Sequence, residues 1–151
     1  MNRIEIRAED VPLPPWTKKA ESYIHKTLEY LDKKNWNLSV LFCSNKYIKS
    51  LNAQFRNIDE ATDVLAFPLG EKNRNGRFTA GDIAVSLDAL EENSRLFKVS
   101  ADEELRRLLI HGILHLSGED HKSNRAEEPM LITQEEILTC INAVVIGGVS
   151  I

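Results

Sequence analysis

Three histidines within eleven residues constrain this chain more than any other feature of its sequence. They lie in the run His111-Gly-Ile-Leu-His115-Leu-Ser-Gly118-Glu-Asp-His121. Positions four apart share one face of a helix, so the spacing predicts a helix that presents His111 and His115 to one point. Glycine at position 118 permits a left-handed turn, which returns His121 toward the same point. The run therefore predicts a helix followed by a sharp turn, with three converging imidazoles.

Three converging imidazoles indicate a metal site. Neutral imidazole is a good zinc ligand, and three protein ligands leave the fourth tetrahedral position for water. Such an ion lowers the pKa of its water to about 7 and polarises a phosphoryl oxygen, so no neighbouring carboxylate base is required. We therefore expect one zinc ion held by His111, His115 and His121. The alternative is a set of surface or capping histidines after a helix end.

Two other kinds of metal site compete with this interpretation. Metzincin proteases share the histidine spacing, but they carry a general-base glutamate after the first histidine, where this chain has Gly112. Met130 resembles their methionine turn only by residue type, and a lone methionine before a helix is more typical of core packing. A structural site is the second rival, because Glu119 or Asp120 could supply a fourth ligand and close it.

Composition fits one soluble globular domain. Of the 151 residues, 42% are hydrophobic and 28% are charged, so we expect a single domain over residues 1–151. Cys43 and Cys140 form no CxxC pair, which excludes a cysteine-based zinc finger and argues against a disulfide framework. No apolar stretch has the length of a signal peptide core or a membrane span, so we expect a cytoplasmic protein without membrane contact.

Charge is unevenly distributed along the chain. The net charge of −4 argues against a protein that coats nucleic acid, DNA included, by bulk electrostatics. Residues 44–80 carry six basic and four acidic side chains, whereas residues 101–151 carry four and nine. A phosphate-bearing partner would therefore meet the middle segment, although an ordinary solvated surface explains the same counts.

Hydrophobic periodicity predicts an α+β domain with a mixed sheet of about four strands, about five helices, and the metal site on a helix–turn. The expected strands are 3–7, 38–43, 64–67 and 81–85, and the expected helices lie around 16–31, 48–55, 87–97, 100–118 and 133–145. Pro68 should end the third strand, since it has no N–H. Ser100 with Glu103, and Thr133 with Glu136, form capping boxes that should open the last two helices. The apolar tail, residues 144–151, is compatible with packing, pairing or a loose end.

Two blocks of sequence carry a resemblance to a known family. One is the histidine run, and the other comprises Leu51-Asn52, Phe55-Arg56 and Thr62-Asp63-Val64-Leu65-Ala66-Phe67-Pro68, followed by Gly81-Asp82-Ile83. With these blocks, and in the length and order of its elements, the chain resembles the YbeY endoribonucleases of bacteria. Ala66 stands where serine is common, a mild change in an apolar strand. Glu119 stands where tyrosine is common and places an acid beside the histidines.

The resemblance implies single-strand-specific cleavage of RNA, maturation of small-subunit ribosomal RNA near its 3′ end, and ribosome quality control. It implies zinc on His111, His115 and His121, with Arg56 as a cleft arginine important for activity. Arg56 and His115 are thus the expected catalytic residues. The implied partners are single-stranded and ribosomal RNA, the ribosome, a small-subunit ribosomal protein and the GTPase Era.

The residues themselves leave several alternatives open. A planar guanidinium suits phosphate, so Arg56 would bind the scissile group, but a surface ion pair with Asp59 or Glu60 is the competing role. Arg74 and Arg77 could follow an RNA backbone, although a solvated loop is the favoured interpretation. Aromatic residues are only 7%, which gives no sign of a stacking platform for single-stranded bases. Another metal-dependent hydrolase, or a non-catalytic ribosome-assembly factor with a structural metal, remains the alternative function.

Overall fold

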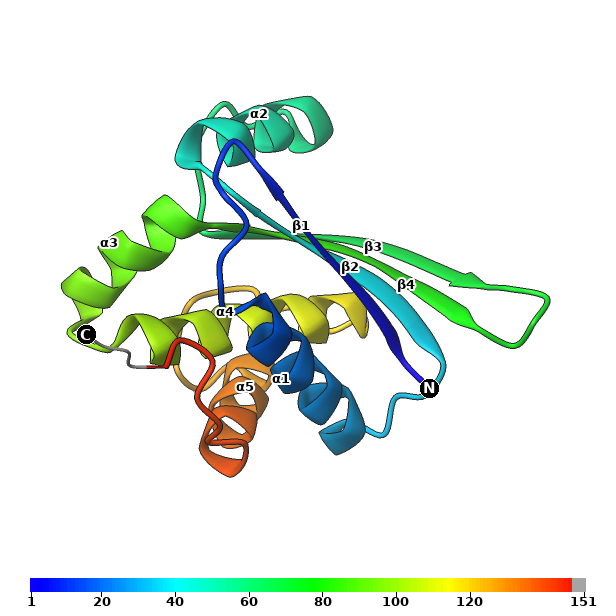
Figure 1. Ribbon diagram of the computed structural model, residues 1–151. Coiled ribbons are helices and arrows are strands. Elements are labelled where there is room, and N and C mark those ends of the chain that lie inside the picture. The colour runs from blue at the N-terminus through cyan, green and yellow to red at the C-terminus, as the bar shows by residue number, and fades with distance from the viewer. Residues whose placement is uncertain (148–151) are drawn as a thin grey trace.

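A mixed β-sheet separates two unequal layers of helices in the computed structural model, which describes residues 1–147 (Figure 1). Within these residues the sheet has the strand order β1-β2-β4-β3, where β3 runs antiparallel to β4 and the other pairs are parallel. Its strands are β1 (Arg3–Glu9), β2 (Trp36–Cys43), β3 (Val64–Lys72) and β4 (Phe78–Ser86). The helices are α1 (Thr17–Tyr30), α2 (Asn45–Arg56), α3 (Leu87–Phe97), α4 (Ala101–Leu116) and α5 (Pro129–Cys140). The predicted α+β class, with about four strands and about five helices, is confirmed.

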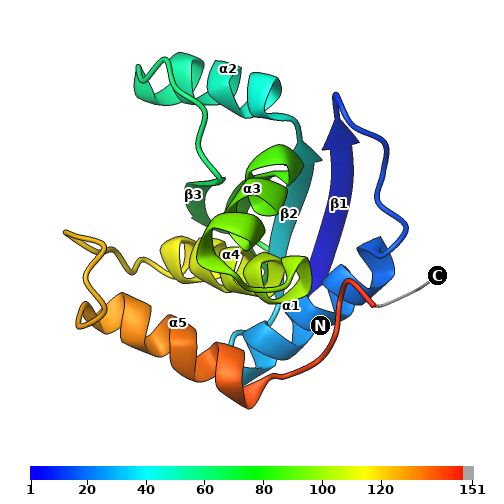
Figure 2. The same ribbon diagram turned by 90° about the vertical axis from the view of Figure 1, so that its left-hand side faces the viewer.

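The two faces of the sheet are covered to very different extents. Helices α1 and α4 pack on one face, where Val40, Ile83 and Val85 are fully buried in the main hydrophobic core. Helix α2 covers only one end of the other face, over a small second cluster that includes Leu65 and Ala84 (Figures 1 and 2). Much of this second face, called the outer face below, therefore stays open. Within residues 1–147, no helix has the length and apolar character that crossing a bilayer requires.

Helix α4 is the central element of the main core. It begins after Ser100, whose hydroxyl accepts a hydrogen bond from the Glu103 N–H at 3.0 Å, as the predicted capping box requires. The reciprocal half of the box does not form, because the Glu103 carboxylate instead pairs with Arg107 at 3.0 Å. The helix ends at Leu116, and Gly118 follows with φ at +93°, the left-handed turn expected from the sequence.

The third strand does not end where the sequence suggested. Pro68 was expected to stop it, but β3 continues to Lys72, and Pro68 lies opposite Gly81 of β4. The β3–β4 pairing shifts register between Pro68 and Glu71, and β3 is one of the two edge strands of the described sheet. Proline is tolerated on an edge strand or at a bulge, since a missing N–H there need not interrupt the ladder.

The start of the last helix was also predicted wrongly. Helix α5 begins at Pro129, because proline has the φ that a first helical position needs. Thr133 lies within this helix and donates its hydroxyl hydrogen to the Pro129 carbonyl at 3.1 Å, so it caps nothing. Val145, expected on the helix, is fully buried beyond its end, and its N–H donates to Asp102 Oδ1 at 2.6 Å. The apolar tail therefore packs at Val145, and its last residues, 148–151, lie outside the described part of the chain.

Candidate metal centre and its cleft

The helix–turn of α4 brings the three predicted histidines together. His111 and His115 lie one turn apart near the end of α4, and the turn at Gly118 returns the chain so that His121 faces them. The ring centroid of His111 lies 4.7 Å from that of His115 and 5.2 Å from that of His121. One ring nitrogen from each histidine lies within 4.8 Å of the others. This separation allows all three to bind a single ion.

Hydrogen bonds to the outer ring nitrogens orient two of these imidazoles. Nδ1 of His111 lies 2.6 Å from Oε1 of Gln134 on α5, and Nδ1 of His121 lies 2.7 Å from the Ser123 carbonyl. Because both partners are acceptors, each Nδ1 carries the proton and each Nε2 keeps its lone pair for a metal ion. The Gln134 amide nitrogen in turn donates to Glu135, which fixes the orientation of the acceptor. No sequence pattern indicated Gln134 or Ser123, since both roles depend on tertiary contacts.

The electrostatics of the site favour neutral imidazoles. Burial lowers the pKa of His111 and of His115, and the neighbouring imidazoles lower both pKa values further. Neutral imidazole is the form that binds zinc, so the donor set suits this metal. Among residues 1–147 no carboxylate completes the close group of ligands. Asp120, a candidate fourth ligand, instead accepts the His121 N–H at 2.8 Å and lies 4.0 Å from Nδ1 of His115.

Packing at Gly112 separates this site from that of a metzincin protease. The Cβ of any other residue at this position would lie 2.8 Å from Cγ2 of Ile83, in the core between α4 and the sheet. Contacts that short do not occur without displacement of the neighbour, and Ile83 is fully buried. A glutamate at position 112 would therefore disrupt the core, so the protease base is excluded by packing as well as by sequence.

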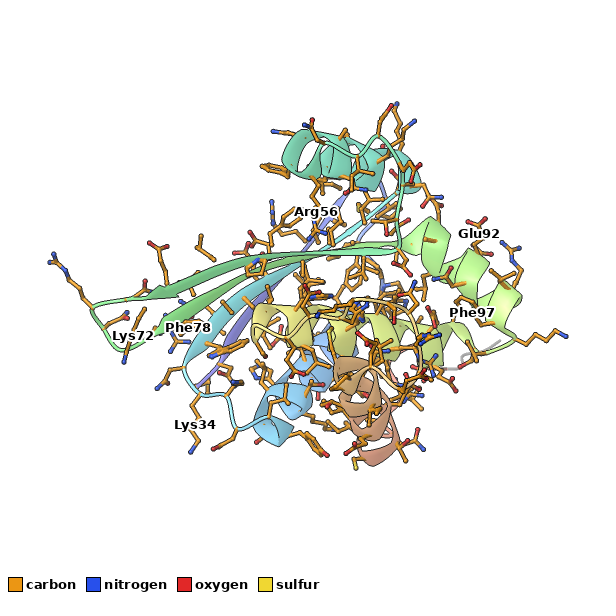
Figure 3. All side chains as sticks on the ribbon, turned by 180° about the vertical axis from the view of Figure 1, so that it is seen from behind. Lys34, Arg56, Lys72, Phe78, Glu92 and Phe97 are labelled. Atoms are coloured by element: carbon orange, nitrogen blue, oxygen red, sulfur yellow. The ribbon has the colours of Figure 1, made fainter. Side chains whose placement is uncertain are left out.

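A cleft of about 530 Å³ contains the histidines and extends to Arg56 at the end of α2. Nη2 of Arg56 donates to the Ala66 carbonyl on β3 at 2.8 Å, and Figure 3 shows the residue between α2 and the sheet. Within residues 1–147 Arg56 forms none of the recorded ion pairs, and Asp59 lies 3.9 Å from Lys49 instead. The single bond to Ala66 leaves other N–H groups of the guanidinium free of recorded protein acceptors among the described residues.

Two carboxylates that had no predicted role, Asp63 and Glu104, also line this cleft. The Asn93 amide donates to Asp63 at 3.0 Å and to Glu104 at 3.2 Å, and Arg107 binds Glu104 at 3.2 Å. Glu104 is only 3% exposed, and burial raises its pKa. These residues come from the β3 entry, α3 and α4, so no local spacing could have predicted the cluster.

Both interpretations of Arg77 were wrong. Its side chain neither follows the surface nor lies in a solvated loop, because it is only 9% exposed. Its guanidinium donates to the Asn37 side chain at 2.8 Å and to the carbonyls of Met1 and Trp36. Arg77 therefore ties the β4 entry to the first residues of the chain. Arg74 is exposed in the β3–β4 turn, as expected of a solvated loop.

Known proteins match this chain over most of its length. A family model described as Endoribonuclease YbeY matches residues 3–142. Proteins named Endoribonuclease YbeY include one from Treponema denticola, 48% identical over 124 residues that cover 80% of each chain. Another, from Treponema pallidum (strain Nichols), is 41% identical over 142 residues, which cover 91% of this chain and 89% of the relative. The solution structure of TM1509 from Thermotoga maritima superposes with a TM-score of 0.57 at 34% identity and covers 89% of this chain and 86% of that one.

Proposed function

This chain belongs to the YbeY family of endoribonucleases, and from that premise we propose that it is a zinc-dependent endoribonuclease specific for single-stranded RNA. The observation that carries the proposal is the presence of three converging imidazoles and Arg56 in one cleft. A phosphodiester needs both a Lewis acid and a cationic donor near its oxygens, and these residues supply the two.

Each residue of the cleft has a distinct role in this proposal. His111, His115 and His121 would hold the ion, with Gln134 and the Ser123 carbonyl fixing the protonated Nδ1 atoms. Zinc bound there supplies Lewis acidity toward a phosphoryl oxygen and acidifies a water molecule. Arg56 holds the scissile phosphate through its free N–H groups and offsets the charge that develops in the transition state. The catalytic residues are thus Arg56 and His115.

The biological setting of the proposal follows the family. We place the enzyme in the maturation of small-subunit ribosomal RNA near its 3′ end and in ribosome quality control, in the cytoplasm. Its partners would be the ribosome, a small-subunit ribosomal protein and the GTPase Era. A structural metal in a non-catalytic assembly factor is disfavoured, because no fourth protein ligand joins the histidines among residues 1–147.

The test compares cleavage of a single-stranded fragment from the 3′ region of small-subunit ribosomal RNA by zinc-loaded wild-type protein and by two variants. We expect Arg56→Ala to lower kcat/KM by roughly 10²- to 10³-fold, as for loss of one transition-state donor, and His115→Ala to abolish cleavage. His25→Ala, on the exposed side of α1, is the matched control and should cleave like the wild type. Equal activity in all four proteins would overturn the proposal.

A further inference from the structure

We propose that an unpaired base of the RNA strand stacks in a second groove, on the opposite side of β3 from the metal cleft. The proposed function is its premise, since the strand is the one cleaved at the histidines. The groove, called the aromatic groove below, lies between α2 and the outer face of the sheet and has a volume of about 330 Å³. Its apolar walls comprise Tyr47, Leu51, Phe55, Phe67 and Ala84.

Two phenyl rings form the outer part of the aromatic groove. Phe55, in the last turn of α2, is 61% exposed, and its ring centroid lies 5.5 Å from that of Phe67 on β3. The rings meet at an angle of 63°, so their faces are not stacked on each other. An exposed aromatic ring such as that of Phe55, beside an arginine that can bind phosphate, is the kind of element that binds single-stranded bases, because every base offers a π-face.

Arg56 connects the aromatic groove with the metal cleft. It lines the cleft, while its guanidinium carbon lies 5.8 Å from the ring centroid of Phe67, which lines the groove. The wall between the two hollows is the edge strand β3, to which Arg56 is hydrogen-bonded through the Ala66 carbonyl. A strand crossing this edge would place a phosphate at Arg56 and an adjoining base against the phenyl rings.

The floor of the aromatic groove is polar, unlike its walls. Ser39, Asp82 and Arg7 point from three strands into this end of the outer face, and the Ser39 hydroxyl donates to Asp82. Side chains of this kind can meet the polar edge of a base whose faces contact apolar walls, which is how flipped and unpaired bases are recognised. An apolar peptide side chain would form no hydrogen bond with these groups.

The experiment measures binding and cleavage of a fluorescein-labelled single-stranded RNA by Phe55→Ala, Phe55→Trp and Phe97→Ala. We expect Phe55→Ala to raise Kd and KM by roughly 5- to 150-fold, the loss of one stacked base, with a smaller change in kcat. Phe55→Trp keeps a π-face and should restore binding. Phe97, 57% exposed at the far end of α3, is the matched control and should behave like the wild type (Figure 3).

A second series identifies the stacked base. An abasic nucleotide is placed at each position of the strand in turn. For the wild type, we expect one position near the scissile phosphate to weaken binding, and for Phe55→Ala the same position should matter no longer. Equal Kd values for Phe55→Ala and Phe97→Ala would overturn the proposal. Identical abasic profiles for wild type and Phe55→Ala would overturn it too.

Failure of the groove is distinguishable from failure of the proposed function. Anisotropy is also measured with His115→Ala, in which binding is read without cleavage. If the function is wrong, the wild type binds the strand but leaves it intact. If the groove is wrong, the wild type cleaves the strand, but Phe55→Ala binds it as tightly as the control does.

Discussion

Gln134 determines how well His111 can bind a metal ion. Its Oε1 accepts from Nδ1 of His111 at 2.6 Å, and its own amide nitrogen donates to Glu135, so the acceptor cannot rotate away without losing a second bond. Such outer partners keep the ring in the binding tautomer. We expect Gln134→Leu, which replaces the amide by an apolar side chain of similar size, to lower zinc affinity by roughly 10- to 100-fold. Competition with a fluorescent chelator measures this affinity.

Gln54→Leu provides the control, because Gln54 is exposed on α2 and belongs to no recorded bond around the histidines within residues 1–147. Zinc affinity should be unchanged in that variant. Circular dichroism of both variants checks that the fold is retained. An unchanged affinity in folded Gln134→Leu would show that the Gln134 hydrogen bond does not support metal binding at His111.

Residue by residue, the sequence predicted what local spacing determines and missed what tertiary contacts determine. The convergence of three histidines follows from a four-residue helical step and one glycine turn, both readable in eleven positions. Gln134 lies 23 positions from His111, and no pattern links the two before the helices pack. The prediction for Arg77 was wrong for the same reason, because its acceptors on residues 1, 36 and 37 lie some 40 or more positions away.

At the scale of elements, α4 carries both the core and two of the histidines, so its N-terminal cap should be measurable in the stability of the whole protein. The Ser100 hydroxyl accepts a hydrogen bond from the Glu103 N–H, and three acidic residues in the first turn interact favourably with the helix dipole. We expect Ser100→Ala to lower the free energy of unfolding by about 1 kcal/mol, in the range of about 0.5–2 kcal/mol found for such caps. Urea denaturation measures the change.

Ser50→Ala is the matched control for this prediction. Ser50 is exposed within α2, and its hydroxyl donates to the Tyr47 carbonyl one turn earlier rather than capping a helix end. Its removal should change the free energy of unfolding by less than about 0.5 kcal/mol. Equal losses in the two variants would mean that the cap of α4 has no special weight.

Element types were predictable, whereas some element ends were not. Alternating or helical hydrophobic periodicity identified each strand and helix, because the buried face must follow the geometry of the backbone. The prediction that Pro68 ends the third strand was wrong, because the effect of proline depends on whether the strand lies at an edge of the sheet. Only the sheet order reveals this. The prediction that the last helix begins at Thr133 was wrong, because Pro129, four positions earlier, is an equally good helix start and allows one more turn.

At the scale of the whole molecule, the overall composition does not show which residues the fold brings together. The low aromatic content suggested no stacking platform, yet Phe55 and Phe67, twelve positions apart, meet where α2 lies over the edge strand. The same topology places Arg56 between two hollows on either side of β3. Composition is a sum over the chain, so it carries no information about such local convergence.

Zinc should stabilise the whole molecule, because its ligands join α4 to the turn after it, and Gln134 ties them to α5. Binding to the folded state at free zinc about 100-fold above Kd adds about 2.7 kcal/mol. For a chain of this length, that stabilisation raises Tm by roughly 5–10 °C, and chelation should reverse the shift. Differential scanning fluorimetry measures it, with His25→Ala as the positive control. His111→Ala should show almost no shift.

The pH dependence of this zinc effect follows from the histidine pKa values. Protons compete with the ion for each imidazole, and an unperturbed histidine titrates near pH 6.5. Because burial lowers the pKa of His111 and of His115, both imidazoles stay neutral to a lower pH than an exposed histidine would. We therefore expect the zinc-induced rise in Tm to persist to a lower pH than a site of exposed imidazoles would allow, and to be lost as the pH falls through the lowered pKa values of His111 and His115. A rise in Tm that does not depend on pH, or one that persists in His111→Ala, would place the ion elsewhere on the protein.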